Sequence, residues 1–214
     1  PKDIQLHSLL GCCLWHTTVL FRKSLVDGAG QYSMNFVGGP EDYDLWARLL
    51  DKTQIVNLPA VLAKQRLHNA SITAGWDVGF SMYCSVAQRL LTQYLGKTIN
   101  HKDATAFVSI CGWDGDLTQI DFNSGIVILR LVLIAAQDKE DRSVFEKFRK
   151  RCVDALVRQA GTVVYTNHRL AVSLLIEASR HAPLVTISPK WISTFLRIVT
   201  PGFLRNTIKR YRIT

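Results

Sequence analysis

Several features that would place a protein in a familiar class are missing from this 214-residue sequence. No apolar run reaches the roughly 20 residues that a transmembrane helix needs, and the N-terminus shows no signal-peptide pattern. The five cysteines are odd in number and have no zinc-ligand spacing. Internal repeats and low-complexity segments are also absent. We therefore expect reduced thiols in a cytoplasmic protein.

Acidic residues are missing from the last 26 positions, which hold six of the basic residues: Lys190, Arg197, Arg205, Lys209, Arg210 and Arg212. The formal net charge is +9, so most of the excess lies in this tail. A basic nucleic-acid-binding protein is one interpretation. The basic residues do not interleave with aromatic residues on a sheet, however, and no recognition motif is present. We therefore expect no nucleic-acid partner.

One stretch gives the clearest structural signal, a predicted helix over residues 41–52. Gly38, Gly39 and Pro40 break the chain before it, and acids then fill its first turn, where they complement the helix dipole. Its apolar residues recur at helical spacing: Leu45, Trp46, Leu49 and Leu50. Asp44 and Arg48 are four positions apart, which predicts a surface ion pair.

The segments on either side of this helix have the composition of β-strands. Residues 11–21 include Thr17, Thr18 and Val19, which are β-branched, and short strands are also predicted near 55–58 and 61–67. Residues 69–75 are polar and predict a loop. For residues 1–75 we therefore expect a partial α/β fold.

From residue 76 onward the pattern predicts only helices. Residues 126–136 are apolar almost all round, which favours a helix buried within a bundle over a central strand. Ser188-Pro189 and Thr200-Pro201 each have the pattern of a helix start. The expected organisation is a part-α/β region, 1–75, followed by an all-α region, 76–214, so that the chain is mostly helical overall.

Three segments in this order resemble the second half of the family 2 glycosyltransferases, which have the A-type, nucleotide-sugar-binding fold. The first runs from His16 to Tyr32 and holds a strand-like stretch, an arginine and a Gly-x-Gly-x-Tyr turn. The second is the acidic helix, Glu41-Asp42-Tyr43-Asp44-Leu45-Trp46-Ala47-Arg48-Leu49, which is the most specific part. The third is Leu58-Pro59 leading to Arg66-x-His68 and a serine. The match covers roughly residues 10 to 75.

The resemblance implies an inverting transfer of a sugar from a nucleotide-sugar donor to a saccharide or lipid-linked acceptor. Asp42 would be the general base, and Glu41 would orient the acceptor or the loop. Arg66 and His68 would contact the diphosphate, and His68 is also a candidate ligand for a divalent metal, Mg²⁺ or Mn²⁺. Trp46 is expected in the core, although aromatic rings also stack on sugars. Trp15 and His16 are weaker candidates for the acceptor pocket.

The sequence departs from the family pattern in one respect. The Asp-x-Asp motif that such enzymes carry before the acidic helix is missing, and Asp114-Gly115-Asp116 follows the helix by about seventy residues in a predicted loop. We therefore expect this chain to lack the donor-binding half and to be inactive alone. The alternatives are a non-catalytic helical interaction module and the basic nucleic-acid-binding protein.

The end of the chain, residues 201–214, has the pattern of a basic amphipathic helix. Leu204, Ile208 and Tyr211 share a stripe, and Arg205, Lys209 and Arg212 flank it. Such a helix can lie on an anionic bilayer, here the inner face of the plasma membrane, or pack on the helical bundle with its charges solvated. Both interpretations stay open at this point.

Overall fold

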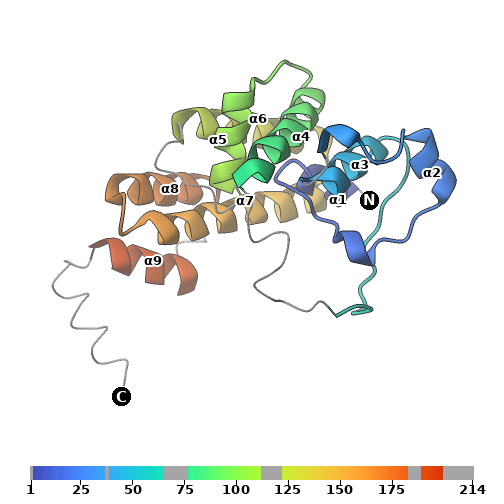
Figure 1. The fold of residues 1–214 in the computed structure, drawn as a ribbon. Coiled ribbons are helices and arrows are strands. Elements are labelled where there is room, and N and C mark those ends of the chain that lie inside the picture. Colours follow the sequence, from blue (N-terminus) through green and yellow to red (C-terminus); the bar gives the residue numbers. More distant parts are fainter. Residues whose placement is uncertain (1, 37–38, 65–76, 112–121, 183–188, 200–214) are drawn as a thin grey trace.

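A computed structural model describes residues 2–36, 39–64, 77–111, 122–182 and 189–199 of the chain (Figure 1). The elements in chain order are α1 (Lys2–His7), the 3-10 helix η1 (His16–Thr18), α2 (Lys23–Gly28), the 3-10 helix η2 (Met34–Phe36), α3 (Glu41–Leu49), α4 (Asp77–Leu95), α5 (His101–Cys111), α6 (Phe122–Lys139), α7 (Arg142–Val163), α8 (His168–His181) and α9 (Pro189–Val199). The predictions for Arg66, His68, the Asp-x-Asp at 114–116, the boundary near residue 75 and the tail 201–214 all lie outside the described residues.

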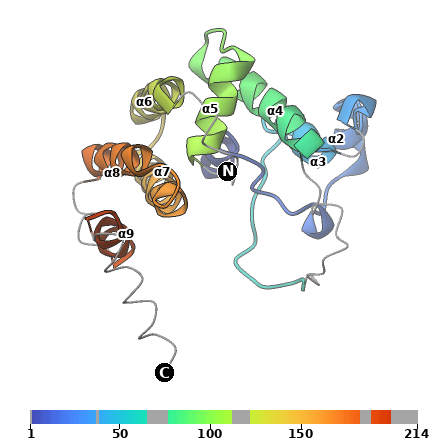
Figure 2. The ribbon, with the colours of Figure 1, turned by 60° about the vertical axis from the view of Figure 1, so that its left-hand side comes forward.

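The long helices form a bundle in which neighbours in sequence are neighbours in space. Helix α4 packs on α5, α5 on α6, and α7 on α8. Helix α1 returns to pack on α7, and α3 packs on α4. Helix α9 lies against α7 and α8, at the end of the molecule away from α2, as the two views agree (Figures 1 and 2).

One hydrophobic core runs through this bundle and includes the first helix. Its fully buried members include Leu6, Phe107, Leu129, Leu156 and Leu174. The helix predicted over 126–136 is confirmed as part of α6, and most of its apolar side chains are buried. Among the described residues, no helix is both long enough and apolar enough to cross a membrane.

Helix α6 is less enclosed than its composition predicts. Val127 and Ile134 are 54% and 59% exposed, so one side of the helix faces solvent. On its buried side, Gly125 lies against α5 so closely that a Cβ atom would come within 2.8 Å of the Ala106 carbonyl oxygen. The small residue therefore allows the two helix backbones to approach.

Helix α3 confirms the helix predicted after Gly39 and Pro40, although it ends at Leu49. Its buried face joins a second, smaller hydrophobic cluster, whose members are Ile4, Leu14, Val26, Ala29, Leu45, Trp46 and Leu49. This cluster lies between α3, the helices α1 and α2, and the loop residues Leu14 and Ala29. It fixes α3 against the preceding part of the chain.

The partial α/β fold predicted for residues 1–75 is wrong for the part that the structure describes, because residues 2–36 and 39–64 contain no β-strand. Within the predicted strand 11–21, residues His16–Thr18 form a 3-10 turn, and the Thr18 N–H and hydroxyl both donate to the Trp15 carbonyl at 2.9 Å. Residues 55–64 are extended but unpaired with any described strand. The expectation of a mostly helical chain is confirmed.

The physical reason for this error is that a strand depends on its neighbour. An extended segment satisfies its backbone N–H and C=O groups only beside another strand or in water, and β-propensity largely measures packing against such a neighbour. Here five of the apolar side chains of the predicted strands stay in solvent: Leu20, Val56, Leu58, Val61 and Leu62 are all more than 60% exposed. Leu14, Val19 and Ile55 instead pack in or against the smaller cluster around α3. Their composition alone did not create a sheet.

Two tyrosines in ring contact connect the loop after α1 to α3 and α4. The rings of Tyr43 and Tyr83 lie 4.6 Å apart, and both are buried. The Tyr43 hydroxyl donates to the Ser8 carbonyl at 2.5 Å, and the Tyr83 hydroxyl accepts the Cys12 N–H at 2.6 Å. Gly11 adopts φ = 148° directly beside the Tyr83 hydroxyl, where a Cβ atom would overlap it. The loop that carries Cys12 is thereby fixed next to the first turn of α3.

Candidate active site

The candidate site is the N-terminal turn of α3, where Glu41 and Asp42 are half-buried. The backbone N–H of Tyr43 donates to Oδ1 of Asp42 at 2.6 Å, which fixes the direction of that carboxylate. Neither acid forms an ion pair with any residue in the described part of the chain. Because Tyr43 anchors the turn in the core, the two carboxylates are held at a rigid position on the surface.

An exposed pair, His16 and Tyr32, lies beside this turn. Nε2 of His16 and the Tyr32 hydroxyl are 3.0 Å apart, within hydrogen-bonding distance. The pKa of Tyr32 is raised above its usual value, first by partial burial and then by the negative charges of Asp42 and Glu41. The pair is linked to α3 by the contact of the His16 ring with Trp46, whose ring centroids lie 6.2 Å apart. His16 was a minor candidate from sequence, and Tyr32 was part of a turn motif with no role of its own.

Trp46 packs in the core against the ring of His16, as expected of a core residue. It is 3% exposed, and the edge of the His16 ring meets its face at a centroid distance of 6.2 Å. Phe21 lies on another side of it, at 5.9 Å. The indole therefore positions the exposed histidine, and its burial leaves no face of the ring open for stacking on a sugar.

Cys12 lies near the same acids but is unsuited to nucleophilic chemistry. Burial raises the pKa of its thiol to about 12, a backbone hydrogen bond with Leu14 opposes this rise, and the charge of Asp42 adds to it. At neutral pH the sulfur thus stays protonated, and only a thiolate is an effective nucleophile. Glu41 and Asp42 are therefore the candidate functional groups of this turn.

The third acid of α3, Asp44, has a structural role. Its side chain is only 2% exposed and lies between two arginines, with Arg48 and Arg89 each donating from a guanidinium nitrogen at 2.8 Å. Arg48 also donates to the carbonyls of Ala29 and Gln31, which ties α3 to the end of α2. The predicted Asp44–Arg48 ion pair is therefore confirmed, but on the carboxylate side it is buried and not at the surface. Arg89, from α4, could not have been foreseen, because no local spacing links it to Asp44.

The residues predicted to hold the diphosphate and the metal, Arg66 and His68, lie outside the described residues. Within the described ranges, no group of three or more His, Cys, Asp or Glu side chains is arranged to hold a metal ion. The described part of the chain thus offers carboxylates and aromatic hydroxyls at α3, and no metal centre of its own.

Comparison of the chain with family models, with curated proteins and with solved structures found no match. The resemblance to the family 2 glycosyltransferases therefore remains a prediction that rests on the motif around α3.

Proposed function

We propose that this chain carries the acceptor side of an inverting glycosyltransferase, with Asp42 as the general base. The observation that supports this proposal is that the acids of α3 lie in different surroundings. Asp44 is buried between two arginines, whereas Glu41 and Asp42 are half-buried and lie beside the exposed His16–Tyr32 pair. A carboxylate that is held rigidly and has no cationic partner among the described residues is suited to abstract a proton. Asp44, on the same helix, instead stabilises the fold.

In the proposed reaction, Oδ2 of Asp42 accepts the proton of an acceptor hydroxyl. The hydroxyl oxygen attacks the anomeric carbon of the donor sugar while the bond from that carbon to the diphosphate oxygen breaks. The nucleoside diphosphate leaves with the bonding electron pair, and the configuration at the anomeric carbon inverts. Because Oδ1 is held by the Tyr43 N–H, the other oxygen keeps a constant direction, which is the positioning that such a step requires.

His16 and Tyr32 are proposed to contact the acceptor. Both present hydrogen-bonding groups at the surface beside Asp42, and a saccharide hydroxyl needs such partners to be oriented for deprotonation. Donor binding is proposed for Arg66 and His68, with a divalent metal on the diphosphate.

The test is a matched pair of substitutions in one helix. In the intact enzyme, Asp42→Asn should leave donor binding and the free energy of unfolding unchanged, and should lower turnover at least about a hundredfold, because the base is lost. Asp44→Asn should instead lower the free energy of unfolding by about 2 kcal/mol, because it removes the charge between two arginines.

Turnover is measured by release of the nucleoside diphosphate, and unfolding by denaturant titration. If Asp42→Asn retains turnover within a few-fold of the unsubstituted enzyme, Asp42 is not the base and the proposal fails.

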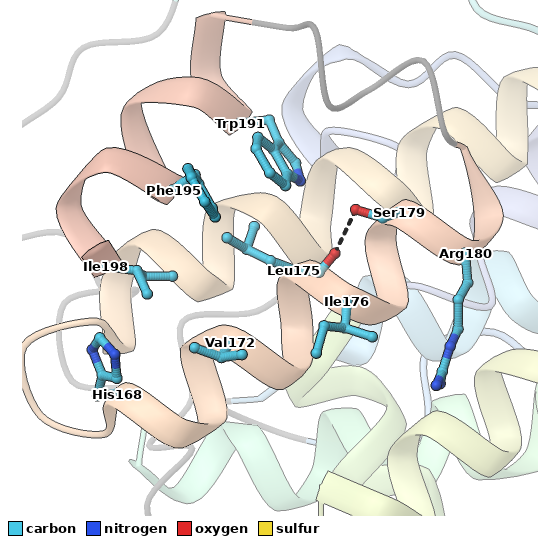
Figure 3. A pocket seen from close by; sticks show the side chains of 9 residues that line it. All are labelled: His168, Val172, Leu175, Ile176, Ser179, Arg180, Trp191, Phe195 and Ile198. Carbon is cyan, nitrogen blue, oxygen red and sulfur yellow. Dashed lines mark hydrogen bonds between the residues drawn. The ribbon is translucent and has the colours of Figure 1, made fainter. Parts of the chain in front are cut away.

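A second candidate is a non-catalytic helical interaction module, and one observation favours it: an apolar groove lies open between α8 and α9, far from α3 (Figure 3). The two candidates differ in what α3 does. In an interaction module Asp44 would stabilise the fold, and Asp42 would have no function. This second candidate therefore predicts that Asp42→Asn leaves the activity of the protein unchanged.

A further inference from the structure

Helix α9 is buried along only one side. Thr194 and Ile198 are 7% and 6% exposed, and the Thr194 hydroxyl lies 3.5 Å from the position that a Cβ atom would occupy at Gly161 of α7. The opposite side carries Ile192 and Leu196, which are 43% and 54% exposed, and Phe195, between the two sides, is 41% exposed. An isolated exposed leucine is ordinary, but three large apolar side chains on one short helix form a stripe whose exposure to water is energetically unfavourable.

This stripe continues into the groove between α8 and α9, which has a volume of about 820 Å³. Figure 3 shows Trp191 and Phe195 of α9 pointing toward α8, where Val172, Leu175 and Ile176 complete an apolar lining. The rings of Trp191 and Phe195 are stacked, 4.9 Å apart, and Ile176 is 49% exposed. We call the surface made by Ile176, Ile192, Phe195 and Leu196 the α8–α9 face.

The described residues 178–182 and 189–199 carry basic side chains and no acid. Their Lys and Arg residues are Arg180, Lys190 and Arg197. Lys190 and Arg197 are exposed on α9, and Arg180 of α8, which is paired with Glu177, lines the other side of the groove. Residues 142–214 contain only three acids, and each is engaged within the fold: Glu146 with Arg149, Asp154 with Lys150, and Glu177 with Arg130 and Arg180.

We propose that the α8–α9 face binds the surface of an anionic lipid bilayer. Two features hold a helix at the surface of a bilayer: an apolar stripe and flanking Lys and Arg side chains without acids. The stripe enters the boundary between headgroups and acyl chains, and the cations contact the lipid phosphates. A membrane suits the observations better than a protein partner, because the exposed charged side chains of α9, Lys190 and Arg197, are both basic and supply no pattern of alternating sign. The proposal does not depend on glycosyl transfer.

The experiment is co-sedimentation of the full 214-residue chain with large vesicles of phosphatidylcholine, alone or with about 30% phosphatidylglycerol. We expect binding to the anionic vesicles and little to the neutral ones. Raising the salt to about 1 M shortens the screening length to about 3 Å and should release most of the protein.

Two double variants test the two features separately. Ile192→Gln with Leu196→Gln should weaken binding to anionic vesicles at least about tenfold, because the apolar stripe is lost. Lys190→Gln with Arg197→Gln should weaken it by about tenfold or more and reduce its dependence on salt. Glutamine keeps a high helix propensity, so α9 should stay folded, which circular dichroism checks.

Matched controls come from the same chain. Val127→Gln with Ile134→Gln removes two apolar side chains of similar exposure from α6, and Lys97→Gln with Lys102→Gln removes two exposed cations from the α4–α5 region. Both controls should bind anionic vesicles like the unsubstituted chain.

Three results would each overturn the proposal. One is an absence of binding to anionic vesicles by the folded chain. Another is that the α9 variants and the control variants weaken binding equally, or that binding is weakened only when Arg205, Lys209 and Arg212 in the tail are substituted. The last is a dimer that Ile192→Gln with Leu196→Gln dissociates in light scattering without any vesicle binding, which would make the face an interface between two copies of the chain.

Discussion

The front of the molecule, residues 2–64, and the helical bundle, residues 77–199, differ in how far their apolar side chains are buried. In the bundle, Phe107, Leu129, Leu156 and Leu174 are completely buried. In the front, the helical residues Leu6 and Leu45 are also completely buried, but outside the helices Leu20 is 99% exposed and Val61 is 91% exposed. The contrast with the bundle therefore concerns the irregular segments around Leu20 and Val61. A helix satisfies its own hydrogen bonds and needs only one face covered, whereas an extended segment needs a neighbouring strand.

Both regions nevertheless contain one buried carboxylate that arginines hold in place. Asp44 joins α3 to α2 and α4, and Glu177 joins α8 to α6 through a bidentate contact with Arg130 at 2.6 and 2.7 Å. The front thus has a fixed point at α3, and this fixed point carries the candidate site. Substitutions in each region should show how far the two differ in stability.

The largest effect is expected at Glu177. Burial alone would raise the pKa of this carboxyl, but hydrogen bonds from Arg130, Arg180 and His181 outweigh it and lower the pKa to about 2. Because the folded-state pKa lies below the unfolded one, the ionised carboxylate stabilises the fold above about pH 4.5, and this stabilisation is lost as the pH falls toward 2. Glu177→Gln should therefore lower the free energy of unfolding by about 3 kcal/mol at pH 7 and flatten its dependence on pH between those limits.

Denaturant titration at pH 7, 4 and 3 measures this prediction. Asp44→Asn in the front is the natural comparison, with the smaller expected loss given above, because only two arginines hold that carboxylate. If Glu177→Gln kept the stability and the pH dependence of the unsubstituted protein, the buried charges would not distinguish the two regions.

A smaller effect is expected where the bundle helices approach most closely. In Gly125→Ala, the new Cβ atom would meet the Ala106 carbonyl oxygen at 2.8 Å, and backbone atoms cannot move aside as a flexible side chain can. We expect the free energy of unfolding to fall by about 2 kcal/mol. Gly28→Ala in the front is the matched control. Nothing lies within 4 Å of its new Cβ atom, so the protein should be unchanged or up to about 1 kcal/mol more stable.

Thermal unfolding of the two alanine variants compares the regions directly. Equal melting temperatures for Gly125→Ala and Gly28→Ala would show that α5 and α6 are less tightly packed than their contact implies.

The smallest effect is expected in the extended segments of the front. Leu20→Ser and Val61→Ser should each change the free energy of unfolding by less than about 0.5 kcal/mol, because their side chains are already in water. Denaturant midpoints of the two variants check this. A loss above about 1 kcal/mol at either position would mean that the front buries these side chains in solution.

Local patterns in the sequence determined several elements of this protein. The break at Gly39-Pro40 followed by acids fixed the start of α3, and Pro189 fixed the start of α9. The apolar run 126–136 fixed α6. These predictions held because a helix forms from interactions within three or four residues, so nearby sequence contains the information.

Tertiary structure alone decided which faces and partners these elements have. The spacing of α3 showed an ion pair between Asp44 and Arg48, but only the fold brought Arg89, 45 residues away, onto the same carboxylate. Spacing likewise could not show that α9 buries Thr194 and leaves Leu196 in solvent. The strand predictions failed for the same reason, because β-branched residues favour an extended backbone but a sheet exists only where the fold supplies the neighbouring strand.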